Sequence, residues 1–228
     1  MYNLNLFIKR AFDIISCSIA ILLLTPVWII VAIAIKTDSK GPVFFKQGRR
    51  TKDGRIFQIL KFRSMCVGAE KQGTGLFSYD NDPRVTKVGA FLRKTSLDEI
   101  PQFFNVLLGD ISIVGPRPCV TYELGDYDTL NKKYKKRFQV KGGITGLAQC
   151  KGRNENSWDE KVTFDGQYVD LFKSEGVWVD IKILWWSVIK VFQSANINED
   201  QREGMSAEES AELDDDEVKR IAHLPDEE

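Results

Sequence analysis

The sequence predicts an α+β protein: a re-entrant membrane helix with a break at its middle, followed by a compact cytoplasmic domain that holds a small β-hairpin or sheet and several helices, some of them interfacial. Three observations predict this class. An uncharged apolar run precedes an alternating pattern around a tight turn, and longer segments with helical periodicity follow. We expect the re-entrant helix at residues 1–36, the cytoplasmic domain at residues 37–198 and an acidic tail at residues 199–228.

The apolar run, residues 14–35, holds 22 residues without a formal charge. A straight helix of that length extends roughly 33 Å, enough to cross a bilayer. Thr25 and Pro26 lie at its middle, where a proline removes a backbone donor and bends or breaks a helix. Basic residues flank the run on both sides, and positive charge marks the cytoplasmic side. The pattern predicts a helix that enters and leaves by one face; a single span and a buried core helix are the alternatives.

The domain begins with strand-like segments at residues 42–47 and 55–62, joined by Lys52-Asp53-Gly54, which is typical of a hairpin turn. Residues 66–82 are polar and contain glycine, as expected of a loop. Helical patterns cover four later segments, the first interrupted near Thr95: residues 88–108, 121–138, 158–172 and 180–195. Aromatic residues and lysines gather in the last segment, which suits a helix at the membrane interface and equally an ordinary core helix.

Composition narrows the chemistry. Residues 1–198 carry 29 basic and 19 acidic side chains, so the folded body is cationic and favours anionic partners such as lipid headgroups or nucleotides. The single histidine, His223, lies in the tail, which argues against histidine triads and histidine-ligated zinc. The four cysteines are far apart and form no C-x-x-C pair, which argues against a disulfide framework. Carboxylates, hydroxyls and cations remain for any chemistry.

The segment Ser96-Leu97-Asp98-Glu99 contains the candidate catalytic residues. It fits a capping box, in which Asp98 and Glu99 would only complement a helix dipole. Alternatively, the two carboxylates hold a metal or attack a phosphorus atom. Pro101 favours the second interpretation, because it denies the carbonyl four residues earlier its usual partner and so distorts the turn. Arg93, just before the segment, is a cation that can hold phosphate.

Further cations lie at turns and strand ends. Arg117 stands between two prolines that fix the backbone, which holds its side chain out for a phosphate or a base; a rigid surface loop is the alternative. Lys61 and Arg63 share one face at the end of a predicted strand. Arg153 follows a glycine and adds another accessible cation.

These motifs, in this order, resemble the bacterial sugar transferase family, the monotopic phosphoglycosyl transferases that begin glycan assembly on polyprenol phosphate. The resemblance covers about residues 6–195. Five ordered blocks carry it: KFRSM at 61–65, DPRVTKVG at 82–89, LRKTSLDEIPQ at 92–102, LGDISIVGPRP at 108–118 and GITGLAQ at 143–149. Thr25-Pro26 stands where members carry a Ser-Pro type of helix break. The chain resembles a small, catalytic-core-only form of the family.

The resemblance implies that a UDP-sugar gives its sugar-1-phosphate to undecaprenyl phosphate and releases UMP. Asp98 would be the nucleophile that forms a phosphosugar-aspartyl intermediate and, with the diphosphate, a ligand of Mg²⁺, while Glu99 would assist. A carboxylate is already ionised at neutral pH and needs no base. The family's phosphate- and nucleotide-contacting motifs, together with a further motif position, supply the substrate-binding residues: Lys61, Arg63, Arg93, Arg117, Arg153 and Asp165.

The resemblance also implies a place at the cytoplasmic face of the bacterial inner membrane, in contact with membrane lipids and not with nucleic acid. Two other functions stay open: a conventional nucleotide-sugar glycosyltransferase using Asp126 and Asp128, and a non-enzymatic membrane-anchored basic module. The chain departs from the family at Gly142, where members commonly have proline. The residues do not distinguish the sugar, the pathway, the oligomeric state or the role of the acidic tail.

Overall fold

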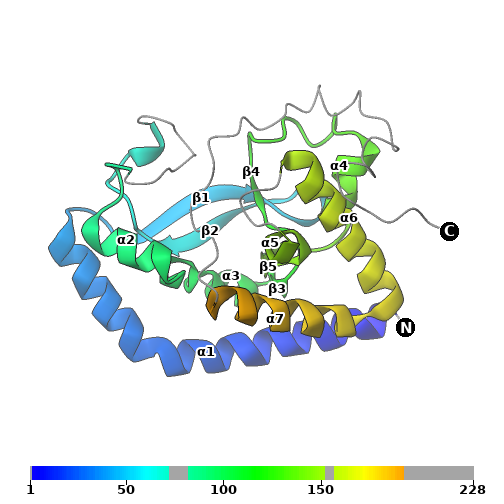
Figure 1. The fold of residues 1–228 in the computed structure, drawn as a ribbon, viewed down its shortest axis with the longest axis horizontal. Helices are drawn as coiled ribbons and strands as arrows, with labels where there is room; N and C mark the ends of the chain where they lie inside the picture. The colour runs from blue at the N-terminus through cyan, green and yellow to red at the C-terminus, as the bar shows by residue number, and fades with distance from the viewer. Residues whose placement is uncertain (1, 72–81, 152–156, 193–228) are drawn as a thin grey trace.

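The computed structural model describes residues 2–71, 82–151 and 157–192 of the 228-residue chain. Arg153, most of the loop expected at residues 66–82 and the acidic tail lie outside the described residues. In Figure 1, helix α1 (Tyr2–Asp38) forms one edge of the molecule. Helices α3 (Gln102–Leu108) and α7 (Val177–Phe192) and the short strand β3 (Ser112–Val114) contact α1.

Helix α1 stays helical through Pro26, so the expected break takes the form of a bend within one continuous helix, as Figure 1 shows. Thr25 Oγ1 donates a hydrogen bond to Ile21 O at 2.9 Å. This side-chain bond and the missing N–H of Pro26 both act to bend a helix. Only 11% of the most apolar window of α1 is buried within the protein. The helix is long and apolar enough to cross a membrane, and its exposure excludes the alternative of a buried core helix.

The N-terminal part of α1 is fastened to the domain by buried polar contacts. Lys9 Nζ donates to Asp180 Oδ2 at 2.6 Å and to Val114 O at 2.8 Å. The carboxylate of Asp13 accepts from Ser112 Oγ at 2.7 Å and from the backbone N–H that follows at 3.0 Å. These bonds reach residues far along the chain, so they fix where the start of α1 lies against the domain.

The C-terminal end of α1 is fastened to the same domain. Arg63 is buried, and its guanidinium donates to the last carbonyls of the helix, including Ile35 O at 3.4 Å and Ser39 O at 2.8 Å. Asp38 Oδ2 accepts from Val88 N at 2.9 Å. Between the two fastened ends the helix is exposed, with Leu22 75% accessible.

The predicted hairpin is confirmed. Strands β1 (Phe44–Arg50) and β2 (Ile56–Phe62) pair antiparallel, and the short strand β4 (Cys119–Val120) adds to the other side of β1. Asp53 and Gly54 adopt positive φ angles of 55° and 75° in the turn, which the turn residues tolerate. The hairpin therefore presents the end of β2 to the rest of the domain.

A second, parallel pair was not predicted from the sequence. Strand β3 (Ser112–Val114) pairs with β5 (Gly143–Thr145), and each has only three residues. An ideal Cβ built on Gly143 would lie 2.1 Å from Gly115 N, so a glycine is needed for this close approach. The pair brings the Gly115–Pro118 segment against the glycine-rich turn.

The helical prediction for residues 88–108 is confirmed, including its interruption: α2 (Lys87–Lys94) ends before Thr95, and a 3-10 turn at Leu97–Glu99 precedes α3. The two later predictions are also confirmed, by α6 (Trp158–Glu175) and α7.

The prediction of a helix over residues 121–138 is wrong. Turns occupy its first half, and only α4 (Lys132–Lys136) and a 3-10 turn at Arg137–Gln139 are helical. Asn131 caps α4 by accepting from the Tyr134 N–H, which fixes the start of the helix here. Helix α5 (Leu147–Lys151) follows strand β5.

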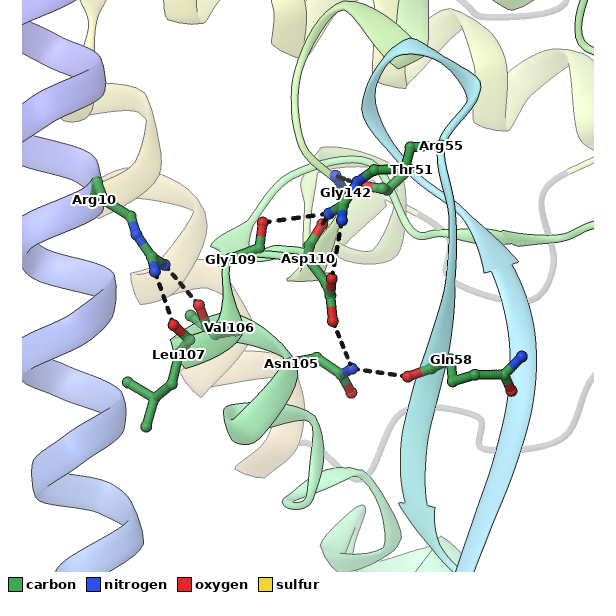
Figure 2. A network of polar contacts seen from close by, with 10 residues as sticks. All are labelled: Arg10, Thr51, Arg55, Gln58, Asn105, Val106, Leu107, Gly109, Asp110 and Gly142. Carbon is green, nitrogen blue, oxygen red and sulfur yellow. Dashed lines mark hydrogen bonds and ion pairs between the residues drawn. The ribbon is translucent and has the colours of Figure 1, made fainter.

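Polar contacts hold α3 from two sides (Figure 2). Arg10 of α1 donates to Val106 O at 2.6 Å and to Leu107 O at 2.8 Å, and so binds the carbonyls at the end of α3. On the other side, Asn105 Nδ2 donates to Gln58 O of β2 at 2.8 Å. Because α3 directly follows Asp98 and Glu99, this network fixes where those carboxylates lie.

Helix α7 has one buried face and one exposed face. Val179 and Ile183 are buried in a core cluster with residues of α6. The other side of α7 exposes Trp178 and Trp185, each 66% accessible, and Ile181. One face of α7 is therefore core, and the opposite face is an exposed aromatic surface.

Candidate active site

The 3-10 turn Leu97–Glu99 presents the two candidate carboxylates. The predicted capping box is wrong: Ser96 has a left-handed φ of 56° and makes no side-chain cap bond. Pro101 has no N–H, and the Leu97 carbonyl accepts instead from Ile100 N at 3.3 Å, which tightens the turn. A non-glycine residue with positive φ two positions before Asp98 is a strained feature of the kind found at functional sites.

Glu99 lies at the centre of a cluster of charges. Its Oε1 is 2.9 Å from Lys61 Nζ and 2.6 Å from Arg117 Nη2, and its Oε2 is 3.4 Å from Arg117 Nη1. The structure thus brings together Lys61 from β2, Glu99 from the turn and Arg117 from the Pro-Arg-Pro loop. The Arg117 side chain remains 38% accessible and can meet a ligand from solvent.

Asp98 and Glu99 have opposite electrostatic environments. Burial raises the pKa of Asp98, and the neighbouring Glu99 charge adds to the rise, while Lys61 and the nearby arginines work against it. Burial also acts to raise the pKa of Glu99, but Arg117 and Lys61 outweigh it and hold that pKa well below its usual range. Glu99 is therefore a stable anion with two cationic partners, and Asp98 is a buried carboxyl whose charge is poorly compensated.

Arg93, near the end of α2, supplies an uncommitted cation. Its positive charge lowers the pKa of Asp98, which places it within electrostatic reach of that carboxyl. Within the described part of the chain its guanidinium makes no hydrogen bond or ion pair. An arginine left in this way beside a buried carboxylate is suited to bind a phosphate group.

The Pro-Arg-Pro loop is held in place by hydrogen bonds to three of its consecutive backbone carbonyls. Pro116 O accepts from Gly143 N at 2.9 Å. Arg117 O accepts from Arg137 Nη2 at 2.6 Å, and Pro118 O accepts from Arg49 Nη1 at 3.0 Å. The donors belong to three different elements, so the Arg117 backbone is fixed before any ligand binds.

Asp165 supports this loop indirectly, through Arg137. It is buried in α6, and its Oδ2 lies 3.0 Å from Arg137 Nη2, the group that binds the Arg117 carbonyl. Burial raises the pKa of Asp165 to about 6. The structure therefore places Asp165 behind Arg137, where it supports the loop and makes no contact with the Glu99 cluster.

Sequence reasoning missed Arg137 and Arg49. Both lie in runs with other basic residues, where a solvent-facing cation is the ordinary expectation. A signal for Arg137 is its place next to Phe138 in a run whose apolar residues Tyr134 and Phe138 face the core. The spacing of Tyr134 and Phe138 identifies the side of the run that faces the core, and Arg137 lies beside it.

The other predicted site residues lie elsewhere. Arg63 caps the end of α1 and is not part of the Glu99 cluster. Arg153 is outside the described residues. Asp126 and Asp128 lie in the exposed turn before α4, where Asp126 Oδ1 accepts from Asp128 N at 3.4 Å. Neither aspartate lines the cavity beside Glu99 and Arg117.

The departure at Gly142 has a structural counterpart. Gly142 N donates to Thr51 Oγ1 at 3.0 Å, and Thr51 Oγ1 donates to Asp110 O at 3.1 Å (Figure 2). A proline at this position has no N–H to give. This buried bond joins the glycine-rich turn to the residue that follows β1.

Comparison with known proteins identifies the family of the chain. The family described as bacterial sugar transferase matches residues 4–194. A UDP-glucose:undecaprenyl-phosphate glucose-1-phosphate transferase of Klebsiella pneumoniae is 46% identical over 83% of this chain and 41% of its own length. An undecaprenyl-phosphate galactose phosphotransferase of Salmonella typhimurium is 42% identical over 78% of this chain and 39% of its own length.

A UDP-N-acetylgalactosamine-undecaprenyl-phosphate N-acetylgalactosaminephosphotransferase of Aeromonas hydrophila is 40% identical over 80% of this chain and 43% of its own length. The chain therefore spans about two fifths of the length of these relatives. Their names specify different sugars and the same lipid carrier, undecaprenyl phosphate. The match covers the turn with Asp98 and Glu99, the Pro-Arg-Pro loop and most of α1. This chain belongs to the bacterial sugar transferase family.

Proposed function

We propose that this chain transfers sugar-1-phosphate from a UDP-sugar to undecaprenyl phosphate and releases UMP. The observation that carries the proposal is the pairing of a buried carboxylate, Asp98, with a neighbour, Glu99, that already binds two cations. The names of the relatives support these substrates. Each of the three names contains a sugar, the transfer of a phosphate group and undecaprenyl phosphate.

In the first step, an Asp98 oxygen attacks the phosphorus that bears the sugar. A bond forms between that oxygen and phosphorus, the anhydride bond to the other phosphate breaks, and UMP leaves with the electron pair. In the second step, an oxygen of undecaprenyl phosphate attacks the same phosphorus and displaces Asp98. The product is a lipid diphosphate sugar, and the carboxylate is restored.

The other residues of the site stabilise charge or hold neighbouring side chains in position. Burial weakens the hydration of Asp98, which makes its anion more reactive towards phosphorus. Arg93 and the exposed part of Arg117 face the incoming diphosphate charge, which grows on the phosphoryl oxygens as the bond breaks. Glu99 keeps Lys61 and Arg117 beside Asp98 by the contacts described above.

The donor set fits Mg²⁺. This ion binds proteins through one or two carboxylates and completes its shell with water and substrate phosphates. Asp98 is such a carboxylate, and its burial leaves a negative charge that a cation would compensate. Glu99 is already engaged by two cations, and the described residues contain no group of three or more acidic, histidine or cysteine side chains. Bound by Asp98, Mg²⁺ would supply charge neutralisation at the diphosphate.

We further propose that α1 is re-entrant and that the domain lies at the cytoplasmic face of the inner membrane. Lys9 near one end of α1 and Asp38 at the other end both contact the same domain. A straight span would carry these ends to opposite sides of a bilayer, which the shared domain does not allow. The bend at Thr25-Pro26 and the exposed middle of the helix support a wedge that enters and leaves by one face. The exposed tryptophans of α7 suit the headgroup region of the same face.

The proposal is tested with the full chain in detergent or membranes, supplied with Mg²⁺, undecaprenyl phosphate and a panel of UDP-sugars. We expect release of UMP, and none from the Asp98→Ala variant. The matched controls are Asp126→Ala and Asp128→Ala, which should keep full activity. Release of UDP in place of UMP, or loss of activity in the controls only, would favour a conventional glycosyltransferase instead.

A further inference from the structure

A cavity of about 200 Å³ opens beside the Glu99 cluster. Its walls come from the turn before α3, from α3, from the Pro-Arg-Pro loop, from β5 and α5, and from α7. Glu99 and Arg117 line one end of it, and Thr145, Gln149 and Ser187 line another part. The cavity therefore includes Glu99 and Arg117, the residues next to Asp98, and also reaches Ser187 of α7.

One buried hydrogen-bond acceptor in the cavity wall has no donor among the described residues. Gln149 Nε2 donates to Ile144 O at 3.3 Å, which orients the amide. Gln149 Oε1 is buried and has no hydrogen-bond partner among the described residues. Buried acceptors without partners are unfavourable and uncommon in folded proteins. A ligand that donates a hydrogen bond inside the cavity would satisfy this oxygen.

A neighbouring hydroxyl also offers an acceptor to a ligand. Thr145 Oγ1 and Ser187 Oγ are 2.6 Å apart, and Ser187 Oγ donates to Ile183 O at 2.8 Å. The single Ser187 proton is used in that bond, so Thr145 is the donor between the two hydroxyls. Cys150 Sγ lies 3.4 Å from Ser187 Oγ and is the donor of that contact, so Ser187 accepts from Thr145 and Cys150. The lone pairs of Thr145 Oγ1 remain for a ligand, and this part of the cavity therefore presents an acceptor that Ser187 orients.

Ile100, Phe103 and Ile144 give the cavity an apolar wall, and Ser96 and Cys150 complete its lining. An apolar cavity of about 150 Å³ can hold a benzene ring, so about 200 Å³ holds a substituted six-membered ring. A pyranose sugar combines the required properties. Its hydroxyls donate hydrogen bonds, and the C–H groups on one side of its ring pack against apolar and aromatic side chains.

We propose that this cavity binds the sugar of the UDP-sugar donor, with Gln149 Oε1 accepting a hydrogen bond from a sugar hydroxyl. This proposal rests on the proposed function. The sugar is attached to the phosphorus that Asp98 attacks, so it lies next to Glu99, whereas the uracil ring is separated from that phosphorus by a phosphate and a ribose. An isoprenoid chain has no donor for Gln149. Gln149 and Ser187 are then residues that determine which sugar the chain accepts.

The test compares Gln149→Leu with wild type in two assays on the full chain with Mg²⁺. The first measures kcat/KM for each UDP-sugar and KM for undecaprenyl phosphate. The second measures equilibrium binding of UDP-sugar and of UMP, which lacks the sugar. We expect kcat/KM and affinity for the preferred UDP-sugar to fall about 10- to 100-fold while UMP affinity is unchanged. Gln139→Leu is the matched control, because Gln139 is exposed and contacts Lys173 on the surface; it should match wild type in every assay.

Three results would overturn the proposal. An equal fall in UMP and UDP-sugar affinity would assign the cavity to the nucleoside. A rise in KM for undecaprenyl phosphate alone would assign it to the lipid, and no change in any constant would leave the cavity without a ligand. Ser187→Ala, measured in the same way, replaces Gln149→Leu if that variant does not fold, and we expect it to change the ranking of UDP-sugars. Failure of the proposed function is distinct, because then wild type turns over no UDP-sugar whatever the binding assay shows.

Discussion

Asp98 and Glu99 are neighbours in the chain, yet their surroundings differ in charge. Arg117 and Lys61 both contact Glu99, and the pKa of Glu99 falls well below its usual range. Burial dominates at Asp98 and raises its pKa. Glu99 is thereby fixed as an anion that positions cations. Asp98 keeps an incompletely compensated charge, which a phosphate-bound cation or a covalent bond to phosphorus would relieve.

Asp165 gives a pH-dependent prediction. Burial raises its pKa to about 6, above the value of about 3.9 expected in the unfolded chain. The folded chain therefore holds a proton between about pH 4 and pH 6 that the unfolded chain has lost, and the Asp165 contribution to stability falls as pH rises through this window. Asparagine does not titrate. The stability of Asp165→Asn relative to wild type should rise across the window, by up to about 3 kcal/mol.

Thermal unfolding in detergent at a series of pH values measures this difference. Asp170→Asn is the control, because Asp170 is an exposed aspartate of the same helix. A gap between Asp165→Asn and wild type that stays constant with pH would show that Asp165 titrates normally.

At the scale of single residues, sequence reasoning found the members of the Glu99 cluster but not their supports. Lys61, Glu99 and Arg117 lie in motifs whose spacing and flanking prolines are visible in the sequence. Arg63 was expected beside them, because it shares a strand face with Lys61. The difference arises because β2 ends at Phe62, so the backbone leaves the strand and turns Arg63 towards the carbonyls of α1.

At the scale of elements, Asn105 of α3 decides how the turn Leu97–Glu99 meets β2. Its Oδ1 accepts from Leu60 N at 2.9 Å and its Nδ2 donates to Gln58 O at 2.8 Å, so one side chain pairs with the strand as a backbone would. This pairing places Lys61, the next residue of β2, opposite Glu99.

We predict that Asn105→Leu destabilises the protein by about 2–4 kcal/mol, because a side chain of similar size leaves the Leu60 N–H and the Gln58 carbonyl without their partner. Chemical unfolding followed by tryptophan fluorescence measures the loss. Asn3→Leu is the control, since Asn3 is exposed in the first turn of α1. An Asn105→Leu variant as stable as wild type would show that packing alone holds α3 on β2.

Long periodic elements were predictable and short non-local ones were not. The hairpin, α6 and α7 follow from alternation or helical spacing over many residues. Strands β3 and β5 have three residues each and pair across a long stretch of chain, so no local pattern distinguishes them. The wrong helix at 121–138 came from its charge pattern; Gly125, with a φ of 68°, and the cap at Asn131 confine the helix to its second half.

At the scale of the whole molecule, α1 and the domain form one unit. The start of α1 contacts β3, α3 and α7, and its end contacts α2 and the strand end at Arg63. The apolar middle is left exposed. In the proposed re-entrant arrangement, the turn Leu97–Glu99 would lie close to the membrane surface, where a lipid-linked phosphate would reach it.

The re-entrant arrangement predicts that both ends of α1 lie on one side of the membrane. In a chain without its native cysteines, Asn3→Cys and Lys40→Cys should both react with an impermeant maleimide from the cytoplasmic side. Leu23→Cys is the control: it is exposed on the protein but should resist the reagent, because it lies within the bilayer. Labelling of positions 3 and 40 from opposite sides would establish a single span.

The most direct test of the account is the mass of the protein after incubation with Mg²⁺ and a UDP-sugar in the absence of undecaprenyl phosphate. The account predicts release of UMP and a mass gain of one sugar phosphate, located on the peptide that contains Asp98 and lost when undecaprenyl phosphate is added. Asp98→Asn should show neither. An unmodified wild-type chain that releases UMP only when both substrates are present, or an Asp98→Asn variant with full transfer activity, would contradict the account.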